Sequence, residues 1–193
     1  MKTLLLAAWI CSPLSVSAQA ATWKVDRDHS SVNFSVEHLV ISEVDGSFRN
    51  FDGTIISSRP DFSDARVNFT IVVSSINTGN DPRDNHLRSD DFFNAEQYPE
   101  MTFKSTALTR TADGKYLMEG DLTIRDVTKS IKFNVAYGGT AKDSEGRQRA
   151  GFKANTYLNR FDYGLKWDKM TEAGGMVVDK MVNIELKLEF IKQ

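Results

Sequence analysis

Three histidines are the first residues to test for chemistry, because imidazole both binds metals and transfers protons near neutral pH. His29, His38 and His86 do not form H-x-H, H-x-x-x-H or H-E-x-x-H, the short patterns that place two metal ligands on one face of a strand or helix. A metal site would need ligands from distant segments, and structural or surface roles explain the three residues better. We predict no metal site and no cofactor.

The motifs of nucleophilic and phosphoryl-transfer chemistry are also missing from the sequence. It contains no G-x-S-x-G elbow and no phosphate-binding glycine loop. Adjacent acids such as Asp90 and Asp91 in a polar segment are typical of solvated helix caps rather than of a glycosidase pair. We predict no catalytic residue. His38 is the one candidate to test, because alternation places it on the apolar face of its strand.

Residues 1–20 have the pattern of a secretory signal peptide. Lys2 supplies the positive start, a short apolar run follows, and small residues precede the cleavage site. We predict cleavage between Ala20 and Ala21 and a periplasmic or secreted protein; an uncleaved anchor is the alternative. The only cysteine, Cys11, would then be removed, which excludes thiol catalysis, Cys-based zinc sites and iron–sulfur clusters.

The charge of the chain excludes some classes of partner. The 193 residues include 24 basic and 26 acidic side chains, which are interleaved and give a net charge of −2. Such a chain has no electrostatic footprint for nucleic acid or for an anionic membrane surface. We predict no nucleic-acid partner, no stable membrane insertion, and one domain over residues 21–193.

Alternation of apolar and polar residues predicts antiparallel strands along most of this domain. The clearest case is the C-terminal run MVNIELKLEFIK, where Ile184 and Leu186 share the apolar face and Lys187 lies on the other. Eight or nine strands are expected, over residues 22–37 (broken near Asp28), 47–57, 64–74, 100–110, 115–125, 128–138, 148–158 and 176–191. Short helices are expected after Asp81-Pro82, at 89–91 and within 158–165.

These strands predict an all-β fold. Each strand has one apolar face, and no long helix is available to cover it, so the sheet must close on itself or pack on a second sheet. Short sequential connections favour an extended antiparallel up-and-down barrel of about eight strands, lipocalin-like, with short helices in the connections. The pattern does not separate a filled interior from a hollow one. If the barrel is hollow, its ligand is apolar.

Five separated motifs resemble the YceI family of secreted, lipocalin-like proteins. They are VDRDHSSVNFSVEHL (25–39), VDGSFRNFDGTI (44–55), DNHLRSDDFFNAEQYPEMTFKS (84–105), GDLTIRDVTK (120–129) and RFDYGLKW (160–167). The resemblance covers essentially the whole mature chain. One departure is Asp126, which stands where the family usually has glycine. Because Asp tolerates positive φ, we expect the turn to survive.

The resemblance implies a hollow barrel that binds a long polyisoprenoid or similar amphiphile in a lengthwise apolar tunnel, without catalytic residues. The segment Asn85–Pro99, which breaks the alternation, is then expected to be a short helical cover, with Arg88 and Asp91 facing water and at least one of Phe92 and Phe93 pointing inward. The alternative is that both rings merely pin the connection to the core. The tunnel and its cover are expected to include Phe34, Val36, His38, Phe69, Phe92, Phe93, Phe103, Phe133, Phe152, Trp167, Ile184 and Leu186.

The function favoured on this basis is a carrier or sequestering protein for an isoprenoid lipid such as a quinone or polyprenyl phosphate. Three alternatives stay open: a carrier of fatty acids or fatty amides, an enzyme that acts on an isoprenoid lipid through His38, and a stress protein with a packed barrel and no ligand. The sequence also leaves open whether the protein is a monomer or a homodimer.

Overall fold

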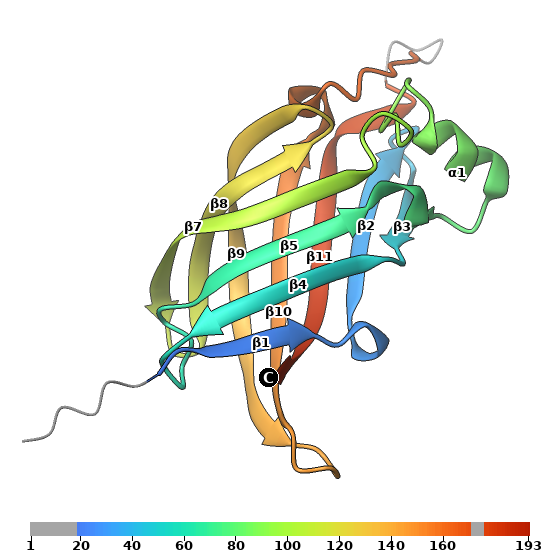
Figure 1. Ribbon diagram of the computed structural model, residues 1–193. Coiled ribbons are helices and arrows are strands. Elements are labelled where there is room, and N and C mark those ends of the chain that lie inside the picture. The colour runs from blue at the N-terminus through green and yellow to red at the C-terminus, as the bar shows by residue number, and fades with distance from the viewer. Residues whose placement is uncertain (1–18, 171–175) are drawn as a thin grey trace, which may run out of the picture.

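The computed structural model describes residues 19–170 and 176–193 and consists mainly of antiparallel strands wound into a barrel (Figure 1). The strands are β1 (Ala21–Val25), β2 (Ser31–His38), β3 (Ser42–Phe48), β4 (Phe51–Ser57), β5 (Arg66–Val72), β6 (Ile76–Asn77), β7 (Glu100–Ala112), β8 (Lys115–Ile124), β9 (Val127–Lys142), β10 (Gln148–Asn159) and β11 (Val178–Lys192). One α-helix, α1 (Asp81–Arg88), and three 3₁₀ turns, η1 (Arg27–His29), η2 (Val73–Ser75) and η3 (Arg160–Tyr163), complete the described elements.

The eleven strands make a closed barrel of eight strand positions, because three of these positions are each occupied by two consecutive strands. The three pairs are β1 with β2, β3 with β4, and β5 with β6. Strand β11 closes the barrel by pairing with β10 on one side and with both β1 and β2 on the other. At the closure, Trp23 is paired with Lys192 and Val25 with Phe190. The predicted lipocalin-like barrel class is confirmed.

The break between β1 and β2 has a local cause. Asp26 caps η1, its side chain accepting a hydrogen bond from the backbone N–H of Asp28. This turn interrupts the strand where the sequence predicts a break near Asp28. The single strand expected over residues 47–57 is two strands: residues 47–48 end β3, which begins at Ser42 and forms a hairpin with β2, and residues 51–57 form β4.

On one side of the barrel the pairing between neighbouring strands is short. β3 pairs with β6 through two residue pairs, Ser47 with Asn77 and Phe48 with Ile76. The chain then leaves the sheet as α1 and returns as β7, so that α1 lies outside the barrel at one end (Figure 1). The segment that breaks the alternation in the sequence therefore covers the place where the strands separate.

Two local predictions are wrong by a residue or more. The helix cap is Asn80 rather than Asp81: the Asn80 side chain accepts from the backbone N–H of Arg83 at 3.0 Å. Residues 89–91 form turns rather than a helix. At the departure from the family pattern, the turn survives, but the positive φ of 57° falls on Arg125 and not on Asp126.

The predicted signal segment 1–20 lies outside the described residues except for Gln19 and Ala20. The first strand begins at Ala21, the residue that the cleavage pattern predicts as the mature N-terminus. None of the helices described here is both long enough and apolar enough to cross a membrane.

Candidate functional site

The barrel encloses a cavity of about 210 Å³. A water molecule in the liquid takes about 30 Å³, so the room corresponds to on the order of seven waters. Small-molecule sites span about 300–1,000 Å³, so this cavity is smaller than a typical site. The barrel is therefore hollow, with room for a short apolar chain.

Ten of the twelve predicted site residues line this cavity: Phe34, Val36, Phe69, Phe92, Phe93, Phe103, Phe133, Phe152, Ile184 and Leu186. They come from the strands by simple alternation, except Phe92 and Phe93, which come from the connection after α1. Both rings of that pair face the cavity, so neither has to be chosen over the other.

His38 and Trp167 are not among the lining residues described. His38 lies on the expected face of β2 but at the strand's last position, beyond the reach of the cavity, where its carbonyl accepts hydrogen bonds from the turn that follows. Trp167 backs Phe92 from outside, with ring centroids 5.6 Å apart. The alternation identified the correct face of β2 and did not fix where along the barrel the cavity ends.

The polar side chains in the lining are bonded within the protein, and that of Asn33 donates to the hydroxyl of Ser31 at 3.1 Å. Tyr116 donates its hydroxyl to the carbonyl of Asp61 at 2.5 Å. Arg160, only 3% exposed, donates four hydrogen bonds to carbonyl oxygens, which belong to Leu165, Trp167, Val178 and Asp179. A ligand inside the cavity therefore meets carbon surface almost everywhere.

Glycines on neighbouring strands let three of the lining rings lie flat against the barrel wall. A Cβ on Gly46 would stand 2.2 Å from the ring of Phe34, and one on Gly53 would stand 2.3 Å from Phe69. Gly120 makes the same room for Phe103, at 2.4 Å. These contacts are too short for real carbon atoms, so any side chain at these positions would push a ring into the cavity. The glycines thus set the width of the cavity, a role that the sequence pattern did not reveal.

The end of the barrel beside α1 is closed by a cover, which we define as α1 together with residues 89–99. Leu87, Phe92 and Phe93 of the cover line the cavity, and Phe93 packs edge-on against Phe48 of β3 at 5.9 Å. His86, on the outer side, bonds Asp91 at 2.8 Å and packs against Phe92. The cover is thus a separate piece of chain that supplies part of the cavity wall.

Arginine side chains hold this cover through backbone carbonyls. Arg88, predicted as a water-facing charge, is half-buried and also donates to the carbonyls of Ser74 and Ile76 at 2.9 and 3.0 Å. Arg125, from the β8–β9 turn, donates to the carbonyl of Phe92 at 3.2 Å and to that of Gly164 at 2.9 Å. These bonds leave the backbone groups of an irregular segment satisfied, as burial requires.

Arg160 does the same for the connection between η3 and β11. Burial lowers the pKa of its guanidinium below the ordinary value, although nearby Asp168 and Asp179 act in the opposite direction. Within the described ranges no carboxylate lies within 4 Å of it. Sequence reasoning missed this residue because a charged side chain is normally expected at the surface.

A phenylalanine on the opposite side of the structure closes the other end. Phe62, in the β4–β5 connection, is 3% exposed and has a positive φ of 59°. Its ring lies 5.1 Å from Trp23, 5.2 Å from Tyr137 and 5.1 Å from Phe152. No alternation marks Phe62 in the polar run SSRPDFSDAR, so sequence reasoning did not predict this plug.

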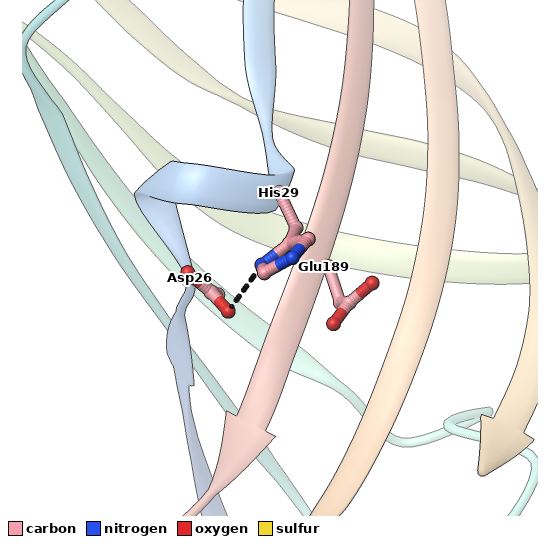
Figure 2. Close-up of side chains that lie close together, drawn as sticks. All are labelled: Asp26, His29 and Glu189. Carbon is pink, nitrogen blue, oxygen red and sulfur yellow. Dashed lines mark hydrogen bonds and ion pairs between the residues drawn. The ribbon is translucent and has the colours of Figure 1, made fainter. Parts of the chain in front are cut away.

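Asp26, His29 and Glu189 form the one cluster of potential metal ligands within the described ranges (Figure 2). His29 bonds Asp26 at 2.9 Å, as the dashed line shows, and Glu189 reaches toward them from β11. Arg149 already supplies a cation there, with one nitrogen 2.5 Å from both Asp26 and Glu189. Burial alone would raise the pKa of Asp26, but the bonds from Arg149 and His29 outweigh it and lower that pKa. The cluster is an ion-pair network that ties η1 to β11.

A closed antiparallel barrel around an apolar cavity is the lipocalin-like class of binding architecture. The model of the YceI-like domain matches residues 23–190, and this chain belongs to that family. Among curated relatives, UPF0312 protein SAB2563 of Staphylococcus aureus is 38% identical over 166 residues, which cover 86% of this chain and 94% of the relative.

Solved structures show the same architecture. A Campylobacter jejuni YCEI protein is 32% identical with a TM-score of 0.70, covering 81% of this chain and 90% of its own. Burkholderia cenocepacia BcnA is 22% identical with a TM-score of 0.72, covering 86% and 98%. A polyisoprenoid binding domain from Saccharophagus degradans is 17% identical with a TM-score of 0.67, covering 89% and 98%. The last two likenesses bear on the fold alone.

Proposed function

We propose that this protein binds an isoprenoid lipid in the barrel cavity and carries, stores or sequesters it. The observation that carries the proposal is the cavity itself: a hollow, carbon-lined interior whose polar side chains are bonded within the protein. Such a site recognises an apolar chain by burying it and offers little to a polar molecule. The similar domain from Saccharophagus degradans is described as polyisoprenoid binding, which agrees with the proposal.

The size of the cavity sets the length of chain it takes without rearrangement. Since a methylene group is about as large as a water molecule, the room suits on the order of seven carbons. That is about one or two isoprene units. A longer tail requires the cover to move or the chain to project past it, so the cover has a part in binding long ligands.

Two of the competing functions, an enzyme acting on the lipid and a packed barrel without ligand, are less well supported by the structure. An enzyme acting on the lipid would need a reactive group in the cavity, and His38, the candidate, lies outside the lining. A packed barrel without ligand would not leave 210 Å³ of apolar room. A fatty-acid carrier stays a competitor, because an apolar wall does not by itself distinguish a branched chain from a straight one.

Export to the periplasm or the exterior is part of the proposal. It is supported by the signal pattern in residues 1–20 and by the start of the first described strand at Ala21. N-terminal sequencing of protein from the cell envelope tests it: an N-terminus at Ala21 supports export, and an intact Met1 refutes it.

The function is tested with two series of ligands, prenyl alcohols of 10, 15, 20 and 40 carbons and straight-chain alcohols of 10, 15 and 20 carbons. We expect saturable binding at one lipid per barrel, an affinity that rises with chain length, and a preference for the prenyl series. Native mass spectrometry of protein taken from its own cell envelope gives the natural ligand. Tighter binding of the straight chains at every length would favour a fatty-acid carrier instead, and no saturable binding in either series would defeat the proposal.

A further inference from the structure

The turn between β2 and β3 exposes three consecutive apolar side chains. Leu39 is 39% exposed, Val40 70% and Ile41 83%. Single exposed apolar residues are ordinary on protein surfaces, but a run of three at the tip of a hairpin is not. Met170, 58% exposed, adds a fourth from the adjoining connection. We call Leu39, Val40, Ile41 and Met170 the apolar tip.

The backbone of the turn is held in a conformation that its residues disfavour. Leu39 has φ of 55° and Val40 has φ of 63°, while the carbonyl of His38 accepts a hydrogen bond from the N–H of Ile41. Positive φ at both central residues is the type I′ arrangement, for which Asn-Gly is the favoured pair. For a β-branched residue such as Val40 this conformation is a genuine outlier. The requirements of the turn alone therefore do not account for Leu and Val at these positions, and strain of this kind is found at functional sites.

The apolar tip continues the wall of the cavity to the outside. β2 carries Val36, which lines the cavity, and ends two residues later at His38. Val178, also in the lining, is paired with His38, and the N–H of Leu39 donates to the carbonyl of Val177 at 2.9 Å. The tip, the η3–β11 connection and α1 all lie at the same end of the barrel (Figure 1). This is the end closed by the cover rather than by strand-borne rings.

The charges nearest the tip are mostly acidic. Glu37 and Glu43 lie opposite each other beside the turn, and Asp168 and Lys169 lie on the adjoining connection. Three acids and one base do not attract an anionic surface, so an association through this tip has to come from apolar burial. A protruding hairpin tip with exposed apolar side chains suits a fluid apolar phase better than a shaped protein groove.

We propose that the apolar tip docks the protein onto the surface of a lipid bilayer and places the covered end of the barrel against the acyl chains. The tip would enter the boundary between headgroups and chains by apolar burial, as amphipathic segments do. A lipid tail could then pass between bilayer and cavity without crossing water. The inference concerns a surface separate from the cavity and does not depend on which lipid the cavity takes.

The test uses the protein as purified, without added ligand, and vesicles of phosphatidylcholine alone or with one fifth phosphatidylglycerol. We expect the parent to cosediment with both kinds of vesicle, with little change between low and high salt, because burial of apolar surface is not screened. The double variant Leu39→Asn, Val40→Gly should bind at least about tenfold more weakly, because two large apolar side chains are lost. Ile41→Asn should act in the same direction.

The double variant also separates docking from folding. Asn-Gly suits the positive φ values, so this variant should melt at or above the temperature of the parent while losing vesicle binding. Ile56→Asn, which alters a 41% exposed residue on β4, is the matched control and should bind vesicles like the parent. If the parent protein does not cosediment with either kind of vesicle, the proposal is overturned. So does a parent whose self-association, rather than vesicle binding, is abolished by the double variant, since the tip would then join two copies. Neither result would affect the alcohol titrations that test the cavity.

Discussion

The two ends of the barrel are closed in different ways. At one end Phe62 is packed among three aromatic rings, two of them on β9 and β10, and Arg149 ties η1 and the β9–β10 hairpin together through Asp26, Asp143 and Glu189. At the other end the cavity is closed by the cover, which buries Phe92 in the core and is also held by arginine bonds to backbone carbonyls. Phe62 lies among rings carried by paired strands and is expected to be released only when the barrel unfolds. The cover is a segment outside the strand pairing and can open locally, at a lower free energy.

The largest effect is expected from removing the plug. Phe62→Ala deletes a ring that is buried among Trp23, Tyr137 and Phe152, and such a change costs about 3–5 kcal/mol. For a protein of this size that lowers the melting temperature by roughly 6–20 °C. Thermal unfolding of the ligand-free protein measures it. A melting temperature within a few degrees of the parent would mean that this end is not a plug.

A smaller effect on stability, with a larger effect on ligand exchange, is expected at the cover. Phe93→Ala removes a half-buried ring that packs on Phe48 and borders the cavity, so the melt should stay cooperative and within several degrees of the parent. A fluorescent prenyl probe should dissociate several-fold faster, with little change in its association rate. Phe92→Ala should do the same at a greater cost in stability, because Phe92 also packs on Trp167.

The neighbouring change Asp91→Ala is the control for the cover. Asp91 is exposed and bonds His86 on the outer side, so its loss should leave probe dissociation unchanged and cost about 1 kcal/mol or less. If Phe92→Ala and Phe93→Ala both melt far below the parent and their folded fraction releases probe at the parent rate, the two rings are structural and the cover is no gate.

The smallest effect is expected on the pH dependence of the protein's stability in acid. The bonds from Arg149 hold the pKa of Asp143 well below its ordinary value, and those from Arg149 and His29 outweigh burial to lower the pKa of Asp26. A carboxylate with a lowered folded-state pKa stabilises the fold above the unfolded-state value near 4, and this contribution is lost as the pH falls below it. Urea midpoints at pH 6 and pH 3 should therefore differ more for the parent than for Arg149→Met. Equal pH dependence in the two proteins would show that the network contributes nothing to the plugged end.

Much of the barrel was predictable because half-buried antiparallel strands impose a period of two on the sequence. That period placed Phe34, Ile184 and Leu186 on the cavity side. It could not reveal features made by tertiary contacts. Phe62 stands alone in a polar loop, and Arg160 is buried because four carbonyl oxygens from two segments converge on it. The extent of the cavity along the barrel, which excludes His38, depends on where the turns and the cover close it.

The claim that the barrel interior is the binding site is tested most directly by two adjacent substitutions on β11. Leu186 lines the cavity, whereas Lys187 is exposed and lies 3.4 Å from Glu185 on the outer face. Leu186→Lys places an unpaired charge in an apolar interior, so binding of the C15 or C20 prenyl alcohol should be lost and the melting temperature should fall. Lys187→Leu should bind like the parent, because a shift of one residue moves a side chain to the other face. Titration of both variants with the same alcohol decides it: loss of binding in Leu186→Lys alone supports the cavity as the site, and equal binding in the two variants contradicts it.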